Sequence, residues 1–232
     1  MIGTVIRKNL ADIHECVAAA CAKSGRDPAQ VQLVAVTKYA EWEWVRSLAE
    51  FHRVFGENRP QQLVERSRLL PDVQWHLIGQ LQRNKVRHTI TQTHLIHSVD
   101  STKLLQRIAD VSAELAVRPQ VLLQVNVSEE GTKSGFAMDE LRQAWPSILA
   151  WTDHVAITGL MTMAPADPDA ETARPVFRRL AEFRAELADR CDSRSANLAL
   201  PELSMGMSND FEVAVEEGAT LVRIGSRLFE GL

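Results

Sequence analysis

Val31-Gln-Leu-Val-Ala-Val-Thr-Lys38 is a short apolar run that ends at a single lysine. A run of this length that is rich in β-branched residues is typical of a buried strand. A strand that buries both faces and then ends in a lysine presents an amine at the rim of a sheet, and an amine kept uncharged by burial attacks aldehydes. The opposite interpretation is that Lys38 only ends the strand and points into water, as most lysines do. The run by itself favours this second interpretation.

Composition limits the class of protein. The chain has 232 residues, of which 45% are hydrophobic and 24% charged, which predicts one globular domain with a sizeable core. Its formal net charge of −4 and its lack of basic blocks argue against nucleic acid or an anionic membrane as a partner. No apolar run has the length of a membrane span, and the N-terminus lacks the apolar region of a signal peptide. We therefore expect a cytoplasmic protein.

The rest of the chain alternates between strand-like and helical patterns. A first helix is expected within residues 1–25, ahead of a barrel domain at 31–232. The expected strands are 31–37, 53–55, 74–79, 94–99, 120–127, 155–161, a short strand ending at 203–204, and 220–224. The expected helices between them are 41–51, 60–70, 82–90, 101–116, 138–150, 170–190 and 209–217. Such a succession predicts an α/β fold, a closed (β/α)8 barrel of the TIM type, with a doubly wound open sheet as the alternative.

Polar and small residues gather where the expected strands end, which is where barrel active sites lie. Lys38 follows the first strand and Asn58 the second. The ends of the last two strands carry Ser204, Met205, Met207, Ser208, Arg223, Gly225 and Ser226. Backbone N–H groups of small residues at these two strands form the usual phosphate site of barrels. An amine together with a phosphate site suggests a phosphorylated aldehyde, of which pyridoxal 5′-phosphate (PLP) is the commonest.

Seven segments make the chain recognisable. They are Leu33-Val-Ala-Val-Thr-Lys38, Phe55-Gly-Glu-Asn58, Trp75-His-Leu-Ile-Gly79 with Leu81-Gln-Arg-Asn-Lys85, Thr132-Lys-Ser-Gly135, Gly159-Leu-Met161, Leu203-Ser-Met-Gly-Met-Ser-Asn-Asp210 and Val222-Arg-Ile-Gly225. With these segments the chain resembles the PLP homeostasis protein family, whose fold is similar to the barrel domain of alanine racemase. The resemblance covers essentially the whole chain.

The resemblance implies roles for particular residues. Lys38 would form the Schiff base with PLP, and Asn58 would lie near the cofactor ring. Arg223 would face the pyridine nitrogen. Ser204, Gly225 and Ser226 would hold the phosphate, helped by the backbone from Met205 through Met207 to Ser208. Arg59-Pro60, where the family usually has an aromatic residue, and the tail Phe229-Glu-Gly-Leu232 depart from the family pattern.

The same residues help to decide whether the protein carries PLP or uses it in catalysis. Arginine is always protonated, so Arg223 could only donate to an unprotonated pyridine nitrogen, and such a ring is a poor electron sink. Two-base racemisation needs a group opposite the lysine, which in alanine racemases is a tyrosine of a second domain. This chain has no room for that domain, and its one tyrosine, Tyr39, follows Lys38. We expect a monomeric, non-catalytic protein that stores, delivers or buffers PLP, a vitamin B6 form, and releases it by transimination to unidentified PLP-dependent apo-enzymes.

Other interpretations stay open. The barrel could be an amino-acid racemase or another PLP enzyme, or a PLP-free enzyme that forms an imine between Lys38 and a sugar phosphate. His94 and His97 have the spacing of a metal-ligand pair, but strand positions three apart face opposite sides, so no metal is expected. His76 is a ligand contact or a core residue. Lys133 could supply a second amine, although a solvated loop lysine is the favoured interpretation.

Overall fold

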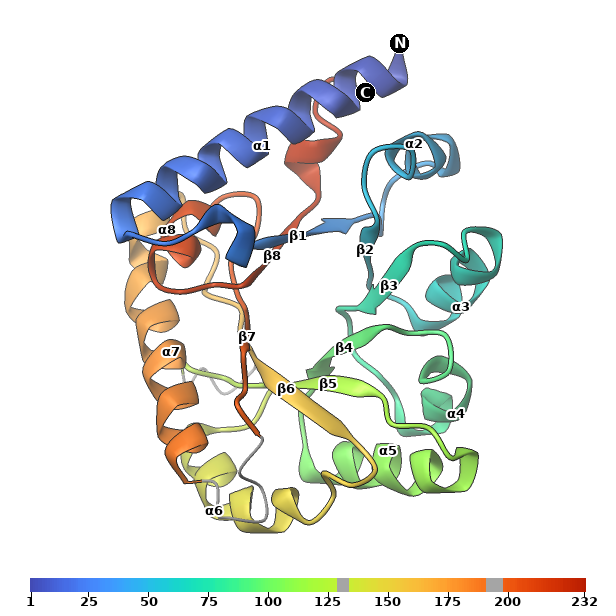
Figure 1. Cartoon of the computed structure of the whole chain (residues 1–232), viewed down its shortest axis with the longest axis vertical. Coiled ribbons are helices and arrows are strands. Elements are labelled where there is room, and N and C mark those ends of the chain that lie inside the picture. Colours follow the sequence, from blue (N-terminus) through green and yellow to red (C-terminus); the bar gives the residue numbers. More distant parts are fainter. Residues whose placement is uncertain (129–133, 191–197) are drawn as a thin grey trace.

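A closed barrel of eight parallel strands lies at the centre of the computed structural model, which describes residues 1–128, 134–190 and 198–232 (Figure 1). Each strand pairs with the next along the chain, and β1 pairs with β8 from Gln32–Leu221 to Ala35–Ile224 to close the ring. The strands are β1 Gln32–Val36, β2 Val54–Glu57, β3 Gln74–Leu77, β4 Leu95–Val99, β5 Gln120–Gln124, β6 Ala156–Met161, β7 Glu202–Ser204 and β8 Leu221–Ile224. The predicted barrel is confirmed, and the open-sheet alternative is excluded because β1 and β8 are not edges.

Helices surround the barrel between successive strands (Figure 1). They are α2 Trp42–Leu48, α3 Pro60–Leu69, α4 Val86–Thr89, α5 Thr102–Leu115, α6 Met138–Leu149, α7 Arg174–Asp189 and α8 Phe211–Glu216, with 3₁₀ turns η1 Pro28–Gln30, η2 Arg83–Lys85, η3 Ala170–Ala173 and η4 Ser226–Leu228. Most of the predicted helices differ from these bounds only by small shifts at their ends, whereas two differ in type. The helix expected at 82–90 is divided into η2 and α4, and the helix expected at 170–190 begins as η3. Among the described residues, no helix is long and apolar enough to cross a membrane.

The predicted N-terminal helix is α1, Ile2–Ser24, which lies outside the barrel against α8, α2 and η4 (Figure 1). Its buried stripe of Ile6, Leu10, Ile13 and Val17 has the helical spacing seen in the sequence. The Asn9 side chain donates hydrogen bonds to the carbonyl oxygens of Leu228 at 3.1 Å and of residue 230 at 2.9 Å, so α1 fixes the C-terminal turn. This turn follows β8 directly and lies beside the end of the barrel where the strands finish.

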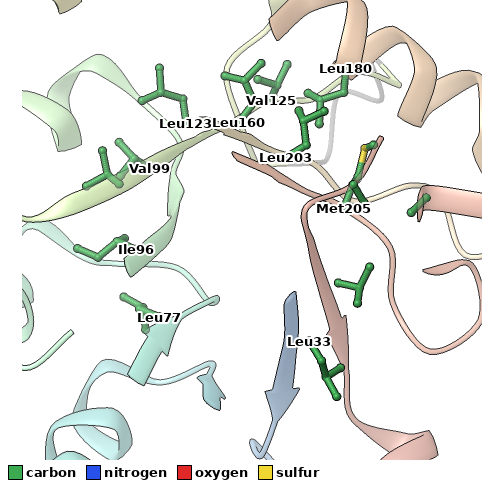
Figure 2. Packing of buried hydrophobic residues seen from close by; sticks show 14 of the residues in the cluster. Leu33, Leu77, Ile96, Val99, Leu123, Val125, Leu160, Leu180, Leu203 and Met205 are labelled. Carbon is green, nitrogen blue, oxygen red and sulfur yellow. The ribbon is translucent and has the colours of Figure 1, made fainter. Parts of the chain in front are cut away.

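Two separate apolar clusters stabilise the fold. The larger lies between the strands and the helices, where Leu33, Leu77 and Leu203 pack outward (Figure 2). The smaller fills the barrel interior with strand residues, namely Val34, Val54, Leu95, Leu122, Met161 and Leu221. Leu33 and Val34 therefore face opposite sides of β1, and both are buried. This confirms the prediction that the first strand is buried on both faces.

Candidate functional site

A cavity of about 550 Å³ lies at the end of the barrel where the strands finish. Seven of the nine residues predicted for the site line it, namely Lys38, Asn58, Met207, Ser208, Arg223, Gly225 and Ser226. They come from segments that follow β1, β2 and β7 and from β8 with the turn after it. The position agrees with the general rule that barrel enzymes and their relatives use the carboxyl ends of the strands.

Lys38 stands two residues beyond the end of β1. Its side chain is exposed and lies at the cavity, so it is a rim amine rather than a buried one. The Lys38 Nζ atom is 5.0 Å from the ring centroid of Tyr39, whose side chain is 85% exposed. The amine is therefore solvated, as the second interpretation of the sequence expects, and it also belongs to the cavity wall, so its reaction with an aldehyde stays a prediction.

A buried ion pair fixes the backbone on both sides of Lys38. The Glu57 carboxylate accepts hydrogen bonds from the Thr37 hydroxyl at 2.6 Å and from the Arg66 guanidinium. Arg66 also donates to the carbonyl oxygens of Thr37 at 2.9 Å and Ala40 at 3.2 Å. Glu57 is fully buried and Arg66 is 8% exposed. Sequence reasoning missed both residues, because a glutamate in Gly-Glu-Asn looks like part of a polar turn and charged residues are rarely buried.

The segments after β7 and β8 offer backbone donors to the cavity. The Gly225 N–H donates to the Ser208 hydroxyl at 3.4 Å, which joins the two segments, and the Met207 N–H donates to the Asp210 carboxylate at 2.6 Å. The N–H groups of Ser208, Asn209 and Ser226 make no hydrogen bond with any residue that the structure describes. These three residues line the cavity, so their N–H groups are candidate donors to an anion there.

Gly225 brings these donors close to the lysine. A Cβ atom at this position would lie 3.3 Å from both the Cβ and the carbonyl oxygen of Val36, at the end of β1. The turn after β8 therefore packs tightly against the strand that leads to Lys38. A larger residue would move the anion donors away from the amine.

Ser204 and Met205 lie outside the cavity. The Ser204 side chain points into the barrel, where its hydroxyl accepts a hydrogen bond from Arg223 and lies 2.8 Å from Nδ1 of His97. The Met205 side chain packs in the outer core, and its N–H donates to the carbonyl oxygen of Leu221 at 3.2 Å. Neither residue has a free group toward the cavity, so their expected phosphate contacts have no geometric basis here.

Arg223 lies beneath the cavity and is 4% exposed. Its guanidinium donates to Ser204 and, at 2.9 Å, to the carbonyl oxygen of Thr162. Burial lowers the pKa of Arg223 to about 10, while the nearby Asp210 carboxylate acts in the opposite direction. The guanidinium is therefore protonated at neutral pH and can only donate hydrogen bonds.

Two histidines, His76 and His97, lie inside the barrel rather than in the cavity wall. His76 and His97 are 1% and 0% exposed, and Nδ1 of His76 lies 3.0 Å from Nε2 of His97. The exposed His94 stacks its ring on His76, with centroids 5.5 Å apart. His76 is thus a core residue, which decides between its two interpretations. Among the described residues, no group of three or more metal-ligating side chains is present.

The cavity also contains residues that were not predicted. Trp44 and Phe229, whose rings stack with centroids 5.8 Å apart, form an aromatic wall. Asp167, Asp169 and Asp210 add carboxylates. Asp167 and Asp169 have no signal in the sequence beyond their position in the loop after β6. Lys133, considered as a second amine, falls outside the described residues.

The fold and the cavity are those of one known class of barrel. The family model for the alanine racemase N-terminal domain matches residues 9–231. The chain is 40% identical over 228 residues to the pyridoxal phosphate homeostasis protein of Aquifex aeolicus, covering 96% of each chain. It is 32% identical over 232 residues to the Escherichia coli protein of the same name, covering 97% of this chain and 95% of the other. The chain belongs to the alanine racemase N-terminal domain family and, within it, to the pyridoxal phosphate homeostasis proteins.

Solved structures agree with this assignment. PipY of Synechococcus elongatus without PLP has a TM-score of 0.80 at 38% identity, over 94% of this chain and 99% of PipY. PipY with PLP bound has a TM-score of 0.78 at 37% identity, over 92% of this chain and 99% of PipY. An alanine racemase of Clostridium difficile shares only the fold, with a TM-score of 0.72 at 14% identity over 96% of this chain and 56% of the racemase. The resemblance found in the sequence is confirmed.

Proposed function

We propose that this chain binds PLP in the cavity and stores, delivers or buffers it, with Lys38 holding the aldehyde as a Schiff base. The observation that carries the proposal is the placement of an amine and three available backbone N–H groups in one cavity of about 550 Å³. These groups match the aldehyde and the phosphate of PLP. The names of the relatives and the PLP-bound PipY structure support the same cofactor.

The remaining lining residues fit the ring of PLP. The aromatic wall of Trp44 and Phe229 offers apolar surface, and Arg223 offers a donor to an unprotonated ring nitrogen. Bound PLP supplies an electrophilic carbon and an electron sink, and the sink is weak when the ring nitrogen is unprotonated. Met207, Ser208, Gly225 and Ser226 would surround the phosphate. Ser204 would act only by accepting a hydrogen bond from Arg223.

The way in which the carboxylates in the cavity are used supports a non-catalytic role. Each accepts a backbone hydrogen bond that shapes its own loop. Asp167 accepts from the N–H of Asp169 at 2.8 Å, Asp169 from that of Glu171 at 3.0 Å, and Asp210 from that of Met207 at 2.6 Å. The exposed Lys38 leaves the imine open to an incoming amine, such as a lysine of a PLP-dependent apo-enzyme in the cytoplasm. Release by transimination needs no further acid or base from the protein.

Reduction with borohydride tests the proposal directly. Protein incubated with PLP, reduced and digested is expected to carry a pyridoxyl-phosphate adduct on Lys38 by mass spectrometry. The Lys38→Ala variant loses this adduct, whereas Lys103→Ala, which removes another exposed lysine, keeps it. Reduction of the protein as purified identifies the bound aldehyde by its mass, so a sugar-phosphate adduct on Lys38 would replace PLP in the proposal. A wild-type protein with no adduct on Lys38 contradicts it.

A racemase is the second candidate, and the carboxylates that line the cavity are the observation in its favour. A racemase exchanges the α-hydrogen of its amino acid with solvent. PLP-loaded protein in deuterium oxide is therefore tested against a panel of amino acids, with deuterium at the α-carbon followed by NMR. The storage role predicts no exchange above that of free PLP. Steady catalytic exchange with any amino acid would establish the enzyme instead.

A further inference from the structure

A chain of four buried polar side chains crosses the barrel interior beneath the cavity. It runs from Arg223 to Ser204, then to His97 and His76, and no member is more than 4% exposed. The links are the Arg223–Ser204 hydrogen bond, the 2.8 Å contact between Ser204 Oγ and His97 Nδ1, and the 3.0 Å contact between His97 Nε2 and His76 Nδ1. Polar side chains in an interior otherwise filled by valine, leucine and methionine are costly, so their arrangement needs a reason.

Arg223 fixes the direction of the first hydrogen bond, and we infer the tautomers of His97 and His76 from it. A guanidinium has no acceptor, so the Ser204 oxygen accepts from it. The single Ser204 proton is then best donated to Nδ1 of His97, which makes His97 the tautomer that carries its proton on Nε2. That proton is donated to Nδ1 of His76, which leaves the His76 proton on its own Nε2. Among the described residues, His76 Nε2 has no hydrogen-bond partner, so the chain ends there.

The protonation states of the two histidines and of Arg223 are compatible with this direction of hydrogen bonding. Burial and then the neighbouring His94 lower the pKa of His76 to about 3, and burial, His76 and Arg223 lower the pKa of His97 well below its usual range. Both rings are therefore neutral at physiological pH. Among the described residues, Arg223 donates to Ser204 and Thr162 and forms no ion pair with a carboxylate, and Asp210 acts on it only at longer range. The chain of oriented dipoles places its negative end on the arginine.

We propose that His97 and His76, acting through Ser204, are positioning residues that aim the Arg223 guanidinium at the ring nitrogen of bound PLP. The inference rests on the proposed function and deepens it. His97 matters most because it takes the Ser204 proton and turns the hydroxyl oxygen into an acceptor for Arg223. Without Nδ1 of His97 as an acceptor, the Ser204 hydroxyl can rotate so that its proton points toward the guanidinium. The two positively polarised groups then repel each other, and Arg223 loses its fixed position. The ring nitrogen then loses a fixed donor, although no residue that touches PLP has changed.

Histidine tautomers in the unmodified protein give the first test. Long-range ¹H–¹⁵N NMR of ¹⁵N-histidine-labelled protein distinguishes protons on Nδ1 from protons on Nε2 without any substitution. Both His76 and His97 are expected as neutral rings with the proton on Nε2. Assignment uses His76→Phe and His97→Leu, each of which removes one set of signals. A His97 ring with its proton on Nδ1, or a charged ring at neutral pH, overturns the inference.

Binding of PLP labelled with ¹⁵N in its ring gives the second test. In the wild type the ring nitrogen signal is expected at the position of an unprotonated, hydrogen-bonded pyridine. His97→Leu should move the signal toward that of a pyridine without a donor and raise the dissociation constant for PLP about tenfold, a typical loss for a hydrogen bond to a charged group. His97→Asn, whose Oδ1 can accept from Ser204, should restore both values. His94→Gln, which changes a ring outside the chain of hydrogen bonds, should alter neither.

The outcomes separate this inference from the proposed function. A wild type that binds no PLP overturns the proposed function. A wild type that binds PLP while His97→Leu leaves the ring nitrogen signal and the affinity unchanged overturns only the positioning role. If His97→Leu does not fold, Ser204→Ala takes its place, because it removes the middle link of the chain. Ser204→Ala is then compared with the wild type and with His97→Asn. Unchanged ring nitrogen signals in Ser204→Ala likewise overturn the inference.

Discussion

At the scale of single residues, Lys38 depends on groups that do not line the cavity. Arg66 links the Glu57 carboxylate to the carbonyl oxygens of Thr37 and Ala40, on both sides of the lysine. We expect Arg66→Met to lower the free energy of unfolding by about 3–5 kcal/mol, because it leaves a buried carboxylate without its partner. Urea unfolding followed by tryptophan fluorescence measures the change.

A matched control separates the effect of removing a buried charge from the effect of removing any arginine charge. Arg178→Met removes an exposed guanidinium that pairs with Glu217, and it should lower the free energy of unfolding far less than Arg66→Met does. The double variant Glu57→Gln with Arg66→Met should recover part of the loss, since no uncompensated charge remains. Equal effects of Arg66→Met and Arg178→Met would show that the buried pair does not fix this segment.

There is a physical reason why some site residues could be predicted from the sequence and others could not. Lys38, Ser208 and Ser226 could be found because strand ends and small residues mark where a barrel cavity lies. Ser204 was placed wrongly with respect to the cavity, since its side chain faces the interior, where it meets Arg223 and His97. The direction in which a strand residue points depends on the tilt and register of all eight strands, which local spacing does not determine.

At the scale of elements, the close packing of α8 on the segment after β7 sets the position of the backbone at Ser208 and Asn209, which line the cavity. Gly206 has φ +88°, and a Cβ atom there would lie 2.5 Å from the Cβ of Ala214 and 2.9 Å from the Cα of Phe211. We expect Gly206→Ala to cost about 1–3 kcal/mol of stability and to weaken PLP binding, because α8 must move away. Thermal unfolding and PLP titration measure both effects.

Gly218 provides the comparison for this variant. It also has a positive φ, +103°, but its nearest neighbour in space would be Leu203 Cδ1 at 3.9 Å. Gly218→Ala therefore carries the backbone strain without the clash, and it should lower stability while leaving PLP affinity unchanged. If both variants weaken binding equally, the packing of α8 does not position the donors.

The order and type of the elements were predictable, whereas several bounds were not. Hydrophobic runs identified every strand of the barrel, because each strand is buried between the interior and the helices. The strand expected at 120–127 ends at Gln124, since Val125 forms only an isolated bridge with Phe136. The helix expected from residue 170 starts as α7 at Arg174, where Pro175 stands in the first turn, a position that favours proline. Such endings depend on contacts between segments far apart in the chain.

At the scale of the whole molecule, one arginine joins the helices on one side of the barrel. Arg174 at the start of α7 pairs with Glu171 of η3 at 2.6 Å, with Glu216 at 2.7 Å and with Glu217 at 2.9 Å. Lys23 of α1 also pairs with Glu216, at 3.2 Å. The two glutamates stand at the C-terminal end of α8, where the helix dipole disfavours negative charge. The positive charge of Arg174 offsets this unfavourable interaction. Together with Lys23, the arginine links α1, α7 and α8.

This network predicts how stability depends on pH. Hydrogen bonds from Arg174 lower the pKa of Glu216, and those from Arg178 and then Arg174 lower the pKa of Glu217. A carboxyl group whose pKa is lower in the folded state stabilises that state above its unfolded pKa, about 4.3, and loses this contribution as the pH falls through the folded pKa. Arg174→Met should therefore cost about 1–2 kcal/mol near pH 7, from its pairs with the partly buried Glu216 and Glu217. The difference from the wild type should shrink as the pH falls below about 4.

Urea unfolding at pH 7, 5 and 3.5 measures this difference in the free energy of unfolding. A difference that stays constant with pH would mean that Arg174 acts through packing rather than through these carboxylates.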